Sequence, residues 1–255
     1  MTHEFSGIRS SFFNEAMLEF PHARAEELSL ALHHLQPRPG ESILEIGAGT
    51  GFFSQAIAQK ISPSLLVASD PSPVQLHALA QKNVENIQLV PSTADALPLQ
   101  HFLLPPCSFD AIWSGGSFHH VQNKTSAFQS FHALLKPGGR VVIADILVGS
   151  DLARHFDLEV AKYCITGHEV SFLSKEFAHS LCHNTGFQEP EFHDVCITWN
   201  FENKIDIGKF LYKIHAMTKS TPGACLFNAE RILGVTYKNG KYCLNWPLTV
   251  LLTYK

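Results

Sequence analysis

The fold is decided by the stretch Ile43-Leu44-Glu45-Ile46-Gly47-Ala48-Gly49-Thr50-Gly51, in which an apolar run with one acidic residue leads into three glycines on alternate positions. Such a short apolar run is typical of a buried parallel strand, and glycines after it let the backbone turn tightly and approach a ligand. In a doubly wound sheet, nucleotide-like ligands bind at that end of the strand. The dinucleotide fingerprint G-x-G-x-x-G would need its third glycine at position 52, which is Phe52, so the spacing here is G-x-G-x-G.

Length, composition and charge indicate an enzyme-sized globular chain. With 255 residues, of which 45% are hydrophobic and 16% charged, the chain can bury one substantial core without disulfides. The net charge is -4 and the 19 lysines and arginines form no basic run. Binding to a phosphate backbone depends on clustered cations, so we expect neither nucleic acid nor an anionic membrane as a partner.

The cysteines indicate a reducing compartment. None belongs to a C-x-x-C pair, and no signal peptide is recognised, so the sequence predicts reduced thiols in a cytoplasmic protein. The apolar stretches have the length of strands, which predicts no stable insertion into a membrane. The six scattered cysteines are Cys107, Cys164, Cys182, Cys196, Cys225 and Cys243.

Strand and helix patterns alternate along the first part of the chain, which predicts a parallel sheet with right-handed crossovers. One or two amphipathic helices are expected over residues 12–35, before the turn cluster 37–40. The expected strands cover residues 42–46, 65–69, 87–90, 109–113 and 140–144, and the expected helices cover 52–60, 73–82 and 124–135.

Two acidic residues follow the second and third expected strands. Asp70 is placed where a carboxylate can accept both hydrogen bonds from a ribose diol. The alternative role is a helix N-cap, which the neighbouring Ser72 can fill instead. Asp95, in the stretch 92–98, can accept from an adenine amino group, and its alternative reading is a turn residue in a surface loop.

Over residues 40–145 these motifs, in this order, resemble the class I S-adenosylmethionine-dependent methyltransferases. The stretch Phe109–Gly116 matches the fourth-strand motif of that family, and Lys136-Pro137-Gly138-Gly139-Arg140 matches the turn before its fifth strand, with Pro and Gly suited to a type II turn. Ser114–Val121 lacks the Pro-Pro-Tyr signature of enzymes that methylate planar nitrogen. It resembles the small-molecule branch, often called type 11, which includes quinone and natural-product methyltransferases.

The resemblance implies a Rossmann-like, seven-stranded, mostly parallel sheet with an antiparallel final strand and helices on both faces. It also implies cofactor contacts. The backbone of the glycine loop would pass under the methionine part, Glu45 would reach the amino group, Asp70 would hold the ribose, and Asp95 with Ala96 would read the adenine. Gln75 stands where quinone-type enzymes often carry a methionine. The full expected set is Glu45, Gly47, Ala48, Gly49, Thr50, Gly51, Asp70, Pro71, Gln75, Asp95, Ala96, Ser114 and Gly115.

Histidines are the candidates for direct chemistry. A neutral imidazole of His119 or His120 can accept a hydroxyl or enol proton during methyl transfer, and the alternative is that both only pack and bind loop backbone. His179 and His183 have a zinc-compatible spacing, but without a third ligand a surface or packing role is favoured. Catechol enzymes of the family need an Asp-Asn pair after the fifth strand, and Asp145 is followed by Ile146, so no metal is expected.

The remaining sequence is expected to complete one methyltransferase domain spanning 1–255. Residues 1–39 form an N-terminal helical cap, 40–149 the cofactor-binding core, 150–173 and 203–245 cap insertions, and 174–202 with 246–255 the C-terminal part of the sheet. A turn is expected at Asn239-Gly240. Aromatic side chains of the cap either line the acceptor site or pack in the core: Phe12, Phe13, Tyr163, His168 and Tyr212.

The sequence thus predicts direct methyl transfer from S-adenosylmethionine to a small molecule, most simply at oxygen or carbon, with S-adenosylhomocysteine as product. Orientation of the reactants supplies much of such catalysis, and no covalent enzyme intermediate is needed. Two alternatives are a non-catalytic relative that binds the cofactor or a partner protein, and a nicotinamide-dependent oxidoreductase, which the glycine spacing disfavours.

Overall fold

The computed structural model describes residues 7–99, 103–168 and 170–255. These residues form two compact units, each assembled from three separate segments of the chain. The first unit comprises residues 1–30, 146–169 and 195–248, and the second comprises 31–145, 170–194 and 249–255. Residues 1–6 of the expected N-terminal cap and residue 169 of the expected insertion lie outside the described residues.

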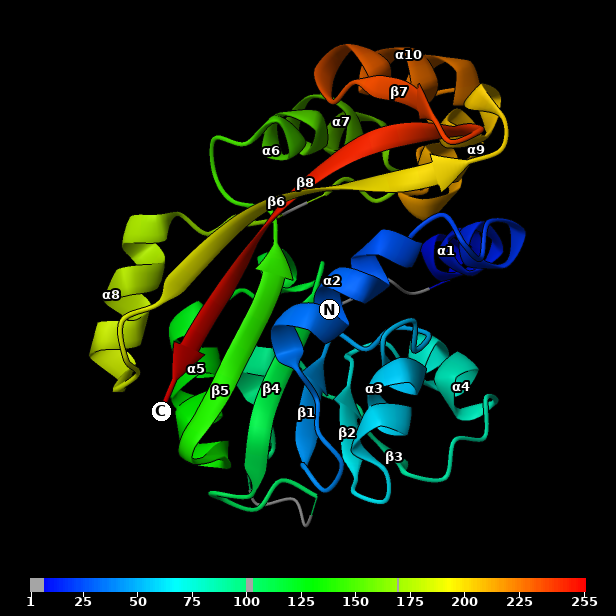
Figure 1. Cartoon of the computed structure of the whole chain (residues 1–255). Helices are drawn as coiled ribbons and strands as arrows, with labels where there is room; N and C mark the ends of the chain where they lie inside the picture. The colour runs from blue at the N-terminus through cyan, green and yellow to red at the C-terminus, as the bar shows by residue number, and fades with distance from the viewer. Residues whose placement is uncertain (1–6, 100–102, 169) are drawn as a thin grey trace. The chain divides into compact units, whose positions relative to one another are not determined.

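The centre of the second unit is a set of five parallel strands in the order β3-β2-β1-β4-β5, which Figure 1 shows side by side. The order reverses between β1 and β4, so this is the switch point at which a doubly wound sheet binds ligands. The prediction of a Rossmann-like parallel sheet is therefore confirmed. The strands are β1 (Ile43–Ile46), β2 (Leu66–Ser69), β3 (Ile87–Val90), β4 (Phe109–Gly115) and β5 (Leu135–Asp145).

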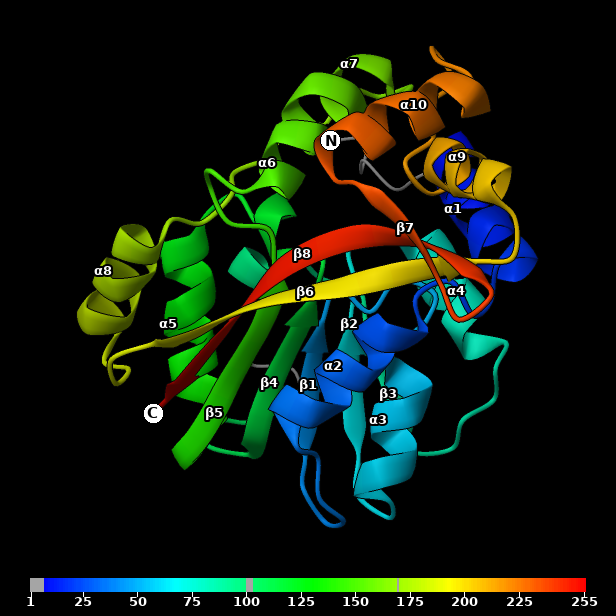
Figure 2. The same ribbon diagram turned by 45° about the horizontal axis from the view of Figure 1, so that its top comes forward.

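The antiparallel end of the sheet is also confirmed. Strand β8 (Lys241–Tyr254) pairs with β5 in antiparallel register, from Asp145↔Thr249 to Arg140↔Tyr254. Strand β6 (Glu191–Phe201) is the next neighbour of β8, and Figure 2 shows the two long strands alongside each other. Both strands contribute residues to each of the two units.

The main path of the sheet holds seven strands, as expected, and the described residues add an eighth strand off that path. The additional strand is β7 (Val235–Lys238), which pairs only with the beginning of β8. Asn239 and Gly240 make the turn between them with φ of 53° and 79°, as the Asn-Gly pair predicts. The sequence pattern missed β7 because it is four residues long and largely exposed, so it shows no apolar alternation.

The start of the fifth strand was also misplaced. The structure begins β5 at Leu135 and includes Lys136-Pro137-Gly138-Gly139, which was expected to be a turn. The register explains the error: Phe109 faces Leu135 but Ala111 faces Arg140, so β5 carries extra residues at this point. Gly138 has a φ of 76°, which fits the backbone bend that the Pro-Gly pair predicts within this irregular stretch.

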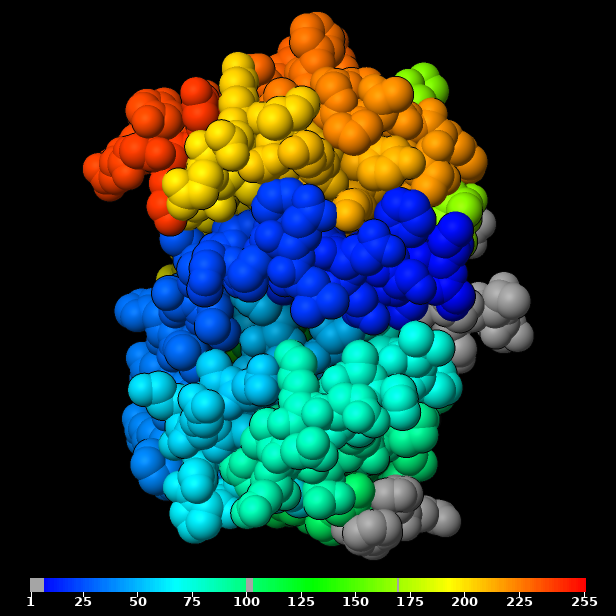
Figure 3. Space-filling view, turned by 90° about the vertical axis from the view of Figure 1, so that its right-hand side faces the viewer, coloured from blue at the N-terminus to red at the C-terminus, as the bar shows by residue number. Residues whose placement is uncertain are grey.

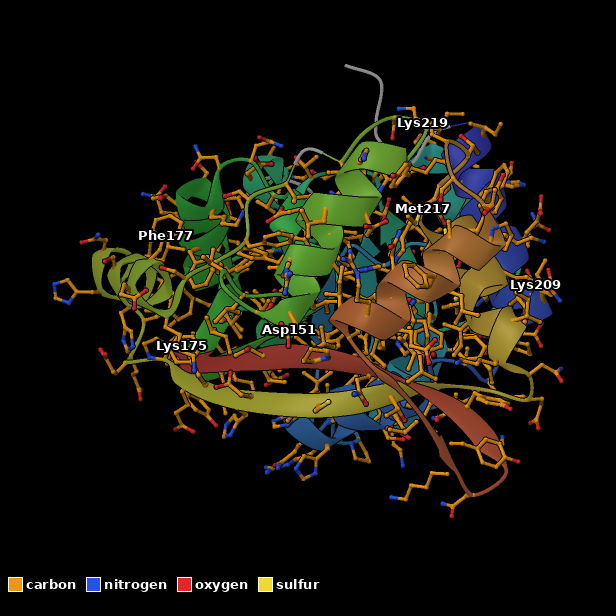
Figure 4. The ribbon with its side chains drawn as sticks, turned by 90° about the horizontal axis from the view of Figure 1, so that it is seen from above. Asp151, Lys175, Phe177, Lys209, Met217 and Lys219 are labelled. Atoms are coloured by element: carbon orange, nitrogen blue, oxygen red, sulfur yellow. The ribbon has the colours of Figure 1, made fainter. Side chains whose placement is uncertain are left out.

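Two helices of the second unit, α4 and α8, begin at serine residues that cap them. The Ser72 hydroxyl accepts from the Gln75 N–H at the start of α4, and Pro73 occupies its first turn. The Ser174 hydroxyl accepts from the Phe177 N–H, and Gly186 ends that helix with a φ of 85°; Figure 4 labels Lys175 and Phe177 at its start. The helices are α3 (Ser54–Ile61), α4 (Pro73–Ala80), α5 (Lys124–Leu134) and α8 (Lys175–Thr185).

The first unit is largely helical. Helix α1 packs on α9, where the Phe12 and Tyr212 rings meet edge to face with centroids 5.9 Å apart. Figure 3 shows these two helices adjoining on one face, and Figure 4 shows Lys209 and Met217 on and just after α9. The helical segments are α1 (Ile8–Glu19), α6 (Asp151–His155), a π-helical turn (Phe156–Val160), α7 (Ala161–Tyr163), α9 (Lys204–Ile214) and α10 (Pro222–Ile232); α2 (Ala25–Leu35) has residues in both units.

None of the helices in the described ranges combines the length and the hydrophobicity that crossing a bilayer requires.

Candidate cofactor and active site

The glycine loop connects β1 to α3 at the switch point of the sheet. Gly47, Gly49 and Gly51 all have positive φ, at 70°, 54° and 81°, a region in which only glycine is unstrained. A Cβ on Gly47 would collide with Ser117, and one on Gly51 would collide with Leu79. A Cβ on Gly49 would come no nearer than 4.0 Å to any neighbour, the Gln75 Oε1. Of the three glycines, Gly49 therefore has open space where a Cβ would lie, so a ligand can approach its backbone there.

Asp70 ties this loop to the end of β2. Its Oδ2 accepts from the Gly49 N–H at 2.9 Å, and its Oδ1 accepts from the Ser72 N–H at 2.8 Å. Since Ser72 caps α4, Asp70 is not needed for the helix N-cap role. A carboxylate can accept about four hydrogen bonds, and the ribose role of Asp70 stays a prediction.

Glu45 lies fully buried in β1 beneath the same loop. The Ser54 hydroxyl donates to its Oε2 at 2.5 Å. Burial raises the pKa of Glu45 to about 8, the Ser54 hydrogen bond opposes that rise, and the nearby charge of Asp70 adds to it. Glu45 is therefore mainly protonated at neutral pH. Lys82 lies just after the C-terminus of α4, and its Nζ donates to the Gly51 carbonyl at 3.3 Å.

Asp95 connects the loop after β3 to the start of α5. It lies with Ala96 in a short 3-10 turn, and its Oδ2 accepts from the Asn123 N–H at 2.9 Å. Asn123 in turn caps α5 by accepting from the Ser126 N–H at 3.0 Å. Asp95 thus lies in a turn, and its adenine role stays a prediction.

The other expected cofactor residues follow strands β2 and β4. Gln75 is 2% exposed, and its Oε1 has no hydrogen-bonding partner among the described residues. Ser114 is paired with Ile46 across the β1–β4 ladder, and its hydroxyl lies 2.9 Å from that of Ser117. A Cβ on Gly115 would press on the rings of Phe53 and Trp113. Pro71 links Asp70 to the cap of α4, as expected from its position.

The two histidines lie in a 3-10 turn (Phe118–His120) that follows β4. Their ring centroids are 4.2 Å apart, and His119 is 5% exposed. The His119 Nδ1 lies 2.6 Å from Asp145 Oδ1, and the His119 N–H donates to Asp145 Oδ2 at 3.0 Å. Sequence reasoning considered Asp145 only as half of an absent metal motif and missed this pairing. Its position at the end of β5, next to β4, was the available signal.

The other histidines and the cysteines singled out in the sequence make packing or surface contacts. His179 Nδ1 is in ion-pair contact with Glu189, which fits the surface role that the sequence favoured. Of the expected cap residues, His168 packs on Phe156 with ring centroids 5.1 Å apart in the first unit. All six cysteines are free, as the scattered pattern predicts.

Residues 44–141 match the protein family described as "Methyltransferase domain". This segment contains the glycine loop, Asp70, Asp95 and both histidines of the 3-10 turn. Together with the sheet order, the match shows a methyltransferase domain over residues 44–141, with the Rossmann-like fold of the class I S-adenosylmethionine-dependent enzymes. The resemblance of the motifs to class I methyltransferases is confirmed over this segment, and the small-molecule branch stays a prediction.

Relatives of known sequence are methyltransferases of more than one kind. The ubiquinone/menaquinone biosynthesis C-methyltransferase UbiE of Legionella pneumophila is 29% identical over 133 residues, covering 46% of this chain and 51% of the relative. An O-methyltransferase of Pyrenophora dematioidea is 28% identical over 157 residues, covering 58% of each chain. The chain therefore aligns with about half the length of these curated relatives.

Among solved structures, a S-adenosylmethionine-dependent methyltransferase of Thermotoga maritima, described as a possible histamine N-methyltransferase, matches over the whole of both chains. The TM-score is 0.64 and the sequence identity 19%. At this identity, the match supports the fold alone.

Proposed function

We propose that the chain transfers the methyl group of S-adenosylmethionine to a small-molecule acceptor by direct displacement at sulfur. The acceptor atom is an oxygen or a carbon, and the second product is S-adenosylhomocysteine. The names of the two sequence relatives, a C-methyltransferase and an O-methyltransferase, support these two acceptor types and a small organic substrate.

One observation carries the cofactor assignment: Asp70 is hydrogen-bonded to Gly49, the glycine of the loop with open space at its Cα. A ribose held by Asp70 therefore lies against backbone that has no side chain to exclude it. In this proposal the backbone from Gly47 to Gly51 contacts the methionine part of the cofactor. Glu45 interacts with the amino group of that part through the glycine loop. Asp95 and Ala96 lie at the adenine.

Pro71, Gln75, Ser114 and Gly115 complete the proposed pocket. Ser114 and Gly115 are the last two residues of β4, and Gly116 and Ser117 separate them from the turn that carries His119 and His120. In this proposal the methyl donor lies at the end of β4, close in sequence to the candidate proton acceptors. Holding donor and acceptor in line can supply about 7–11 kcal/mol of the barrier, so alignment is the main catalytic contribution we assign to the protein.

The proposal is tested first by calorimetry with S-adenosylmethionine, S-adenosylhomocysteine and reduced nicotinamide cofactors. We expect saturable binding of the first two only. A ligand that binds the folded state alone also raises its stability, so millimolar S-adenosylhomocysteine should increase the melting temperature. Binding of a nicotinamide cofactor instead would refute the proposal.

Catalysis is tested by incubating the protein with tritiated S-adenosylmethionine and a metabolite extract. Transfer of the label to an organic product is expected, and Asp70→Ala should transfer it more slowly when the cofactor is below saturation. Cofactor binding without any label transfer would favour a non-catalytic relative.

A further inference from the structure

The first unit contains a polar groove formed by α2 and the strands β6, β7 and β8. Its volume of about 450 Å³ is in the range of sites that hold small molecules. All of its lining residues belong to the first unit, whereas every residue proposed to contact the cofactor belongs to the second. The residues of the groove are thus not those assigned to methyl transfer.

The groove is lined by one face of the sheet that these three strands form. Residues two apart on a strand point to the same face, and Thr198 and Asn200 of β6 both line the groove. Trp199, which lies between them in sequence, is buried. On β7 and β8, which Figure 2 shows side by side, Lys238 lies directly opposite Lys241, and both line the groove. This face of the sheet is therefore polar and carries two ammonium groups.

Glu26 of α2 also lines the groove, and β6 already binds its carboxylate. The N–H and the hydroxyl of Thr198 each donate to it at 2.8 Å, and the amide of Asn200 donates to it at 2.9 Å. Burial alone would raise the pKa of Glu26, but these hydrogen bonds and the charge of Lys238 lower it overall. Since a carboxylate accepts about four hydrogen bonds, Glu26 has little capacity left for a ligand.

The two lysines leave hydrogen-bond donors in excess. Like charges directly opposite each other on paired strands cost stability, and Lys238 and Lys241 are in that position. Lys238 forms no hydrogen bond and no ion pair with the residues that the structure describes. Lys241 Nζ lies 3.3 Å from Glu202 Oε1, but both side chains are exposed, and an ion pair of this kind contributes little. The groove therefore offers two ammonium groups to an anion with more than one negative charge.

We propose that this groove binds a small phosphate monoester whose phosphoryl group lies between Lys238 and Lys241. A phosphate monoester carries a charge of about −1.5 to −2 at pH 7, which matches two ammonium groups, and its oxygens accept their hydrogen bonds. The organic part is hydroxylated, as in a polyol or sugar, because the rest of the groove offers the hydroxyl and amide groups of Thr198, Asn200 and Thr236. This binding does not depend on the proposed methyl transfer.

The first test is calorimetry on the full chain with glycerol 3-phosphate, inorganic phosphate and glycerol as probes. We expect saturable binding of glycerol 3-phosphate, weaker binding of inorganic phosphate, and no binding of glycerol. Absence of binding by glycerol 3-phosphate would overturn the proposal. Equal affinity for inorganic phosphate would show that free phosphate is the ligand and would overturn the assignment of a monoester.

The second test places the ligand with charge-matched variants. Lys238→Gln and Lys241→Gln should each weaken binding of glycerol 3-phosphate about tenfold or more, the loss expected for a charge-assisted hydrogen bond. The control is Lys209→Gln, which removes the same charge from the same unit. Lys209 does not line the groove, and its Nζ donates to Asp206 at 2.8 Å. Equal weakening by all three variants would show attraction by net charge alone and would overturn the site.

The third measurement is NMR on ¹⁵N-labelled protein during the titration with glycerol 3-phosphate. The amide signals of Thr198, Asn200 and Thr236 should shift in proportion to the calorimetric saturation. Shifts confined to the glycine loop 47–51 would place the phosphate in the proposed cofactor site and overturn the groove as its site. Binding of S-adenosylhomocysteine is measured separately, so its failure would count against the proposed function and leave this result unaffected.

Discussion

Replacing Glu45 by glutamine should make the stability of the protein less sensitive to alkaline pH. Burial raises the pKa of Glu45 from 4.5 to about 8. A carboxyl group with a raised pKa in the folded state contributes stability that is present below pH 4.5 and is lost as the pH rises toward 8. At 1.36 kcal/mol per unit of pKa, the full loss is about 5 kcal/mol, and about 3 kcal/mol is already lost at pH 7.

Glu45→Gln keeps the size of the side chain and a group that can hydrogen-bond to Ser54, but it has no charge to desolvate. The free energy of unfolding of the variant, relative to wild type, should therefore increase by several kcal/mol between pH 4.5 and pH 8. At about 2–4 °C per kcal/mol for a chain of this size, the melting temperatures should separate by about 10 °C or more over that range. Circular dichroism melts in a pH series without cofactor measure this directly.

The matched control is Glu41→Gln, because the environment of Glu41 acts in the opposite direction. Partial burial alone would raise the pKa of Glu41, but its hydrogen bonds with Arg140 and the Arg38 backbone outweigh burial and lower it. This variant should lose stability above pH 5 and gain none at pH 8. If Glu45→Gln and wild type keep a constant difference in melting temperature across the series, Glu45 is ionised throughout and the electrostatic account of β1 is wrong.

Four further substitutions test three separate parts of the structure. Asp70→Ala should weaken binding of S-adenosylhomocysteine by about 2–3 kcal/mol, roughly 30- to 150-fold, because two charge-assisted hydrogen bonds to ribose are lost; unchanged calorimetric affinity would leave Asp70 only a backbone role. Gly49→Val should fold, with a modest cost in stability from its positive φ, but should lose cofactor binding. Gly47→Ala should instead lower the melting temperature of the apoprotein, because its Cβ collides with Ser117. A folded Gly49→Val protein with wild-type affinity would show that the glycine loop does not bind the cofactor. Burial lowers the pKa of His155 from 6.5 to about 4, so wild type should lose about 3 kcal/mol of stability as the pH falls from 6.5 to 4, and His155→Leu should lose less; equal acid sensitivity in urea titrations would contradict this.

The placement of the proposed cofactor residues was predictable because they follow strands whose sequence is distinctive. Glycines on alternate positions after β1 and acidic residues after β2 and β3 mark the carboxyl edge of a parallel sheet, and the structure places Asp70 against Gly49 as that edge requires. Strand β7 was not predictable in this way. Its pairing with β8 comes from the turn at Asn239-Gly240, since its four exposed residues carry no burial pattern of their own.

The His119–Asp145 pair was missed because neither residue is informative alone. The two positions are separated in sequence by α5, and they meet only because β4 and β5 are neighbours. A sequence pattern predicts where strands end. It does not give the distance between two side chains that follow different strands. The orphaned Oε1 of Gln75 and the raised pKa of Glu45 are likewise products of burial, which residue type does not reveal.

The pairing of β5 with β8 has a consequence for how the chain folds during synthesis. The apolar segment Val141–Ala144 of β5 lies between two strands. One is β4, which precedes it in the sequence, and the other is Val250–Thr253 of β8, which is synthesised about 100 residues later. Until those residues emerge from the ribosome, the edge of β5 has unpaired backbone groups beside apolar side chains. Exposed edges of this kind recruit other strands and promote aggregation. The yield of soluble protein should therefore respond more to a lower growth temperature or to added chaperones than to substitutions that stabilise the folded state.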